Sequence, residues 1–149
     1  AFDWAIYRPE ETNRVAMMRM PTRPELRSMT WQAIAAGANG LVYYAFFDLL
    51  ERDGWQKDRV AGGWGDLCAV AREVKAFEPV LLSDDPPPVV EGGDGDVAAR
   101  AWSYDGKYCI VMANTLRKNV VGALKVGGRE VPYELGPIEV KFVRLGKER

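Results

Sequence analysis

The apolar residues of this chain change their spacing part-way along it, and that change decides which folds are open to it. Up to about residue 82 they recur every three or four positions or form continuous runs, whereas after Pro88 they alternate. The first pattern predicts helices between fully buried strands, and the second predicts antiparallel strands. We therefore expect an α/β portion at 1–83, a stiff proline-rich linker at 84–88 and an all-β domain at 89–149.

The first portion reads as strand, helix, strand, helix. Residues 2–7 and 41–47 are apolar runs that predict strands, and the second run shows no alternation, which favours a parallel sheet. Thr22 and Glu25 form a capping box that predicts a helix start. After a long loop at 48–63, Trp64 opens the apolar spacing of a second helix and is predicted to lie in the core, and that helix is expected to end near Pro79.

The β portion carries two turn signals between alternating runs. Tyr104-Asp105-Gly106 and Gly127-Gly128 each predict a hairpin, and residues 138–145 predict a last strand. About five antiparallel strands imply a small sandwich or barrel, with Trp102 in its core.

Composition excludes several kinds of function. The 149 residues contain no histidine, which removes serine–histidine catalysis and the usual zinc sites, and we expect no metal and no cofactor. A net charge of −1 gives no case for nucleic acid, and no apolar run is long enough to span a membrane. Two cysteines imply buried free thiols rather than a disulfide framework.

The chain begins directly on a predicted strand, so we expect it to be the carboxy-terminal end of a larger protein. Its localisation stays open. A secreted or periplasmic location would be expected if a leader sequence was lost with the amino-terminal part.

Several segments resemble one enzyme family. Residues 20–27 (Met-Pro-Thr-Arg-Pro-Glu-Leu-Arg) and 37–46 (Gly-Ala-Asn-Gly-Leu-Val-Tyr-Tyr-Ala-Phe) resemble the end of the catalytic barrel in β-galactosidase-like glycoside hydrolases. Residues 64–82 resemble the last helix of the same barrels, and residues 108–115 and 135–142 resemble strands of the β-sandwich that closes those chains. The resemblance implies the last strand–helix units of a TIM (β/α)8 barrel followed by a small antiparallel β-sandwich. It also implies hydrolysis of glycosidic bonds by two carboxyl groups.

Six residues are candidates for the substrate side, four of them from the resemblance. It puts Asp3 and Trp4 at the carboxyl end of one barrel strand and Phe46 and Asp48 at the end of the next, where barrel active sites lie. Tyr44 and Trp55 add aromatic faces on which a sugar could stack. Aromatic residues on a buried strand are more often core residues, so Tyr44 and Phe46 are open to that interpretation as well. The substrate-binding candidates are therefore Asp3, Trp4, Tyr44, Phe46, Asp48 and Trp55.

The catalytic pair stays unknown. Many members of the family carry a nucleophilic glutamate where this chain has Asp3, and their acid/base residue belongs to a strand outside this chain. Asp3 and Asp48 are the candidates here, and each is open to a second interpretation: Asp3 as an acceptor for a sugar hydroxyl or a structural residue, and Asp48 as the cap of a turn. At least one carboxylate is expected from outside this chain.

Two other functions compete with hydrolysis. The β portion could be a non-catalytic module that binds carbohydrate, or the chain could be a structural half that docks on a separately encoded partner. Aromatic residues gathered on a sandwich face would favour the binding module. The expected partners are a carbohydrate substrate and the missing amino-terminal barrel portion, or another chain that supplies it. Alone, the chain is expected to be inactive and to associate, because uncovered apolar edges promote association.

Overall fold

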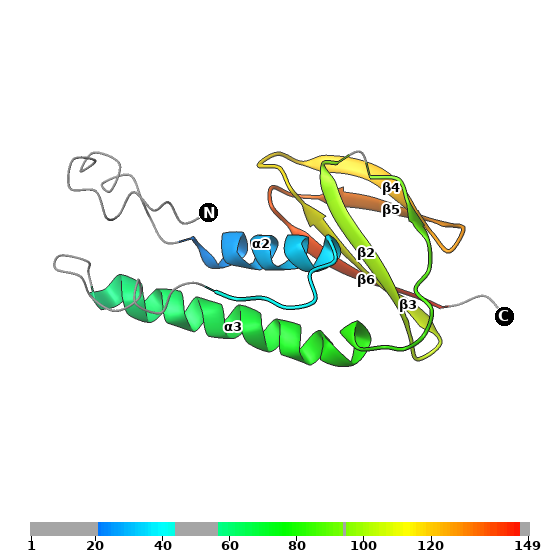
Figure 1. The fold of residues 1–149 in the computed structure, drawn as a ribbon. Helices are drawn as coiled ribbons and strands as arrows, with labels where there is room; N and C mark the ends of the chain where they lie inside the picture. Colours follow the sequence, from blue (N-terminus) through cyan, green and yellow to red (C-terminus); the bar gives the residue numbers. More distant parts are fainter. Residues whose placement is uncertain (1–20, 44–56, 94, 147–149) are drawn as a thin grey trace.

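The computed structural model describes residues 21–43, 57–93 and 95–146 of the chain. Within these ranges two helices precede six strands, in the order α2 (Arg23–Ala35), α3 (Lys57–Leu81), β1 (Val90–Glu91), β2 (Val97–Tyr104), β3 (Lys107–Asn114), β4 (Val120–Val126), β5 (Arg129–Leu135) and β6 (Val140–Gly146). The strands form two three-stranded sheets, ordered β1-β4-β5 and β2-β3-β6, in which every paired strand is antiparallel. Figure 1 shows both helices on the same side of the β2-β3-β6 sheet.

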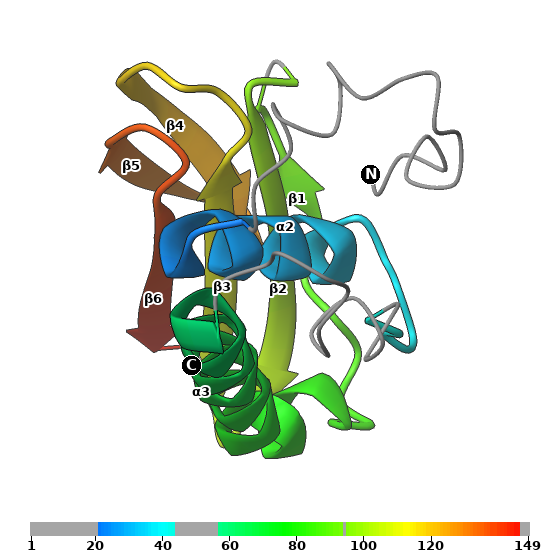
Figure 2. The ribbon, with the colours of Figure 1, turned by 90° about the vertical axis from the view of Figure 1, so that its left-hand side faces the viewer.

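The predicted fold class, the last units of a TIM barrel followed by a sandwich, is wrong. The described residues hold two helices and six antiparallel strands in two small sheets, and they hold no parallel strand pair. Of the two predicted barrel strands, residues 2–7 and 44–47 lie outside the described residues, and residues 41–43 are not in a strand. The helices instead lie against one face of an antiparallel sheet, which can be followed in the turned view of Figure 2. They pack apolar side chains on that face.

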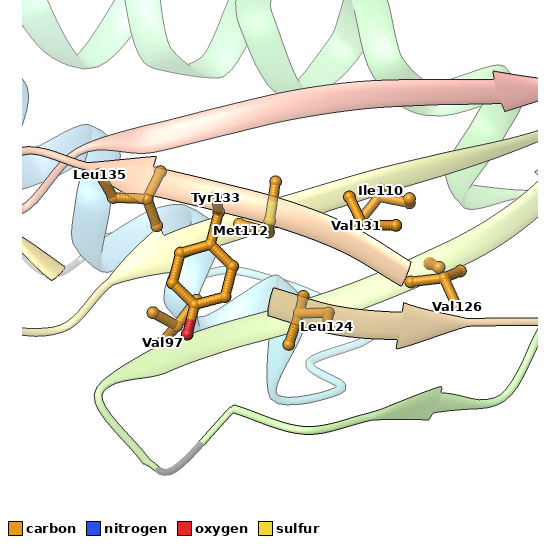
Figure 3. Close-up of a cluster of buried hydrophobic side chains, with 9 residues drawn as sticks. Val97, Ile110, Met112, Leu124, Val126, Val131, Tyr133 and Leu135 are labelled. Atoms are coloured by element: carbon orange, nitrogen blue, oxygen red, sulfur yellow. The ribbon is translucent and has the colours of Figure 1, made fainter. Parts of the chain in front are cut away.

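The β2-β3-β6 sheet is buried on both faces, which explains where the helices lie. In the central strand β3, Ile110 and Met112 point between the two sheets, whereas Cys109, Val111 and Ala113 point toward the helices. Side chains of the first cluster are drawn in Figure 3, where those of β4 and β5 meet those of β2 and β3. A sheet that is apolar on both faces needs a cover on each, and α2 and α3 supply the second one.

Both predicted hairpins are confirmed. Tyr104 pairs with Lys107 across a turn in which Asp105 and Gly106 have φ angles of 50° and 68°. Gly127 and Gly128, with φ angles of 56° and 82°, join β4 to β5 in the same way. Two consecutive residues with positive φ match the twist of the flanking strands, and glycine adopts that conformation without steric cost.

The last strand begins two residues later than predicted. β6 starts at Val140 because Ile138 has a φ of 52° and lies in a turn, in which the N–H of Glu139 donates to the carbonyl of Gly136 over 3.1 Å. A positive φ is unusual for a β-branched residue, so the alternating apolar pattern at 138–140 gave no sign of this turn.

Both predicted helices are present, but the predicted start and end of the second one differ from the structure. The capping box of Thr22 and Glu25 is present at the start of α2, where the N–H of Thr22 donates to Oε2 of Glu25 over 2.9 Å. The structure extends α3 to Lys57, within the predicted loop, and through Pro79 to Leu81. Trp64, predicted to be a core residue, is instead 48% exposed.

Candidate functional site

The six predicted substrate-binding residues, Asp3, Trp4, Tyr44, Phe46, Asp48 and Trp55, lie outside the described residues. The structure therefore brings none of them together, and the roles assigned to them stay predictions. Among the described residues, one group of side-chain hydrogen bonds joins α2, α3 and β6.

We call that meeting point the helix–sheet clasp, formed by Arg27 and Trp31 of α2, Glu73 of α3 and Val140 and Phe142 of β6. The carboxylate of Glu73 accepts from Nε of Arg27, which lies 2.9 Å from each of its two oxygens. Its Oε1 also accepts from Nε1 of Trp31 over 2.7 Å. Nη1 of Arg27 donates to the carbonyl of Val140 over 2.9 Å. One arginine thus ties both helices to the edge strand of the sheet.

Aromatic rings surround this polar contact. The indole of Trp31, fully buried, meets the ring of Phe77 edge-on at 5.3 Å and that of Phe142 at 4.8 Å. Phe77 also meets Trp102 edge-on at 5.9 Å, and the guanidinium of Arg27 lies 5.3 Å from the centre of the Phe142 ring. Edge-to-face pairs at these separations are favourable beyond the area that they bury. The hydrogen bonds of the clasp are therefore surrounded by aromatic side chains.

Two further arginines hold the ends of α2. Arg117, in the loop between β3 and β4, pairs with Glu25 at the start of the helix, with Nη2 and Oε1 at 2.7 Å. Arg100 of β2 donates to the carbonyl of Ile34 in the last turn over 3.4 Å and lies over the ring of Trp102. Cations near the carboxyl end of a helix and acids near its start are both favourable. The helix is thus fixed to the sandwich at its start, middle and end.

The clasp has the chemistry of a structural contact. Both oxygens of Glu73 already accept hydrogen bonds from Arg27, and one of them also accepts from a fully buried indole. A general acid or base instead needs an oxygen within reach of a substrate proton. Among the residues that the structure describes, no group of three or more histidine, cysteine, aspartate or glutamate side chains is placed to hold a metal ion.

A second buried polar group fixes the loop beside β4. Nδ2 of Asn114, fully buried at the end of β3, donates over 2.7 Å to the carbonyls of Lys118 and Gly136, and its Oδ1 accepts from the N–H of Leu116 over 2.9 Å. Across the described part of the chain, every buried side-chain nitrogen and oxygen has a hydrogen-bond partner. Such complete pairing is typical of a structural core.

The clasp was missed at the sequence level. The capping box predicted where this helix starts but not which side of it is buried: Trp31 is fully buried, whereas Met29, about 200° away around the helix, is 50% exposed. The available signal was the spacing of Arg27, Trp31 and Ile34, which repeats every three or four residues and includes the largest apolar side chain. Glu73 lies 46 residues from Arg27, and no local pattern connects them. Cys109 is buried and Cys68 half-buried, and both are free thiols, as the cysteine count predicted.

No protein-family model, no curated protein and no solved structure matches this chain. Neither of the two described helices is long and apolar enough to cross a membrane.

Proposed function

We propose that this chain is a segment of a glycoside hydrolase-like protein that hydrolyses O-glycosidic bonds in carbohydrate. The support is the sequence resemblance of residues 20–27, 37–46 and 64–82, together with the aspartates that it assigns to the substrate side. The reaction uses two carboxyl groups, one as acid and the other as base or nucleophile. Asp3 and Asp48 are the candidates in this chain, and at least one further carboxylate comes from outside it.

In this proposal, the described part of the chain has a structural role and supplies no catalytic residue. The observation that carries this assignment is the helix–sheet clasp, in which Glu73, Arg27 and Trp31 are all occupied in joining two helices to one sheet. A pair of helices that is held in this way forms a firm base for loops at its ends. Along the chain, Asp3 precedes α2 and Asp48 precedes α3.

A carbohydrate-binding module is the alternative, and the sheet faces weigh against it. Such a module needs aromatic rings on an open face, because sugar rings stack on them. The outward-facing residues of β4 and β5 in the described structure include no aromatic side chain: they are Val121, Ala123, Lys125, Glu130, Pro132 and Glu134. Of the aromatic residues in the other sheet, Trp102 and Phe142 are covered by the helices and Tyr108 packs against the cluster between the sheets. Tyr104, at the end of β2, is 38% exposed but stands alone at a hairpin turn.

The partners in this proposal are the carbohydrate substrate and the protein portion that supplies the other carboxylate. A protein partner could bind the exposed apolar side chains of the helix pair, where Met29 is 50% exposed and Trp64 is 48% exposed.

The test is a glycosidase assay on native material. The full chain is isolated from its source with whatever copurifies, and the preparation is assayed on a panel of chromogenic aryl glycosides beside the recombinant chain alone. We expect activity in the native preparation and none in the lone chain. Asp3→Asn or Asp48→Asn in the native assembly lowers kcat, whereas Asp105→Asn, at an exposed hairpin turn, leaves it unchanged. A native preparation that hydrolyses no glycoside in the panel, with the full complement of copurifying chains present, refutes the proposal.

A further inference from the structure

The turn after α2 presents an asparagine–glycine pair to solvent. The hydrogen-bonded end of the helix stops at Ala38, whose N–H donates to the carbonyl of Ala33 over 3.0 Å. Asn39 and Gly40 follow, both exposed, and neither takes part in a hydrogen bond with another described residue. A Cβ built on Gly40 would have nothing within 4 Å. The amide side chain and the next backbone nitrogen are therefore free to approach each other.

The other described asparagines lack this freedom. Asn114 is fully buried, all of its described polar atoms are hydrogen-bonded, and Thr115 follows it. Asn119 is exposed, but the next residue is Val120, the first of β4 and β-branched. A branched side chain stiffens the residue and crowds the approach to its nitrogen, which glycine does not.

We propose that Asn39 is a site of spontaneous deamidation, with conversion to aspartate and isoaspartate. The backbone nitrogen of Gly40 attacks Cγ of Asn39 and loses its proton, the bond from Cγ to the side-chain nitrogen breaks, and that nitrogen leaves as ammonia with the proton. The product is a five-membered succinimide. Water then opens the ring at either carbonyl, which gives aspartate or isoaspartate, and no other reactant is needed.

The modification alters the turn in two ways. It places a carboxylate just beyond the end of α2, where the helix dipole is negative and a second negative charge is unfavourable. The isoaspartate product also adds one methylene to the main chain before residues 41–43. That segment is tied back to α2 by Tyr43, whose Oη lies 2.6 Å from Oγ1 of Thr30. We expect this tie to weaken in the converted protein.

The test follows conversion residue by residue in the folded full chain. The protein is incubated in mildly alkaline buffer, samples are digested at intervals, and the peptides are separated and weighed to quantify asparagine, aspartate and isoaspartate at each position. We expect Asn39 to convert roughly tenfold faster than Asn119, because the residue after it is unhindered. Conversion of Asn114 is expected to be slower still.

The matched variant is Gly40→Ala, which the open space around Gly40 admits without rearrangement. It should slow conversion of Asn39 by roughly tenfold, because the added methyl group hinders attack by the nitrogen, and it should leave the circular dichroism spectrum unchanged. Equal rates at Asn39 and Asn119, or a Gly40→Ala protein that converts at the original rate, would overturn the proposal. Conversion at Asn39 that yields aspartate without isoaspartate would overturn the succinimide route.

Discussion

Replacing Glu73 by alanine leaves two donors in the clasp without their acceptor. The indole N–H of Trp31 is fully buried, and an unsatisfied buried donor costs about 1–3 kcal/mol. A hydrogen bond to a charged group contributes about 1.5–3 kcal/mol, and the contact with Arg27 falls at the lower end of that range because it is partly screened by water. The side chains of Arg27 and Glu73 are 28% and 32% exposed. We therefore expect Glu73→Ala to lower the free energy of unfolding by about 3 kcal/mol.

Glu73→Gln separates the two contributions. The glutamine keeps a carbonyl oxygen that can accept from the indole, so we expect the loss to fall to about 1.5 kcal/mol. The matched control is Glu78→Ala, on the same helix, where the pair with Lys75 is exposed (73% for the lysine and 44% for the glutamate) and should contribute no more than about 0.5 kcal/mol.

The measurement is urea unfolding of the full chain, followed by the helical circular dichroism signal. The difference in midpoint at an unchanged slope gives the change in stability. If Glu73→Ala and Glu78→Ala lower the stability by the same amount, the clasp does not join the helices to the sheet, and the structural role assigned to it is wrong.

Two further predictions concern the sandwich. Gly122 lies opposite Tyr133, and a Cβ at that position would be 2.6 Å from the tyrosine oxygen. Gly122→Ala should therefore lower the stability by about 1–3 kcal/mol in calorimetry. Gly65→Ala, in an open helical position, should raise the stability by up to about 1 kcal/mol. Equal melting temperatures for these two variants would contradict this reasoning. Asn114→Ala removes three buried hydrogen bonds and should cost about 2–4 kcal/mol. It should also speed hydrogen exchange at the Leu116 amide, which Asn119→Ala should not, and unchanged exchange in both variants would count against the buried clamp.

The turns and the helix start could be predicted from the sequence, whereas the elements that pack against each helix or strand could not. The hairpins at Asp105-Gly106 and Gly127-Gly128 could be predicted because each turn is specified by two adjacent residues. The run at 41–47 was interpreted as a strand of a parallel sheet because it is apolar throughout. Residues 109–113 are equally apolar and lie in an antiparallel strand. An unbroken apolar run indicates cover on both faces, and it does not give the direction of the neighbouring strands.

The same limit applies to the clasp. Arg27 and Glu73 lie on two different helices, and their contact depends on how those helices pack on the sheet. The helical period identifies one side of a helix, but α2 carries apolar residues on more than one side, with Trp31 facing the sheet and Met29 facing away. Only the packing distinguishes these two sides. The predicted site residues remain untested, since all six lie outside the described residues.

The double-sided burial of the β2-β3-β6 sheet has a consequence for anyone who wishes to cut or transplant this protein. A gene fragment that encodes residues 89–149 alone would produce a sandwich with Trp102, Val111 and Phe142 turned to water on one face. Exposed apolar sheet faces of that kind promote aggregation. A gene fragment for a stable domain must therefore begin before Thr22 and include both helices, so that they cover this face of the sheet.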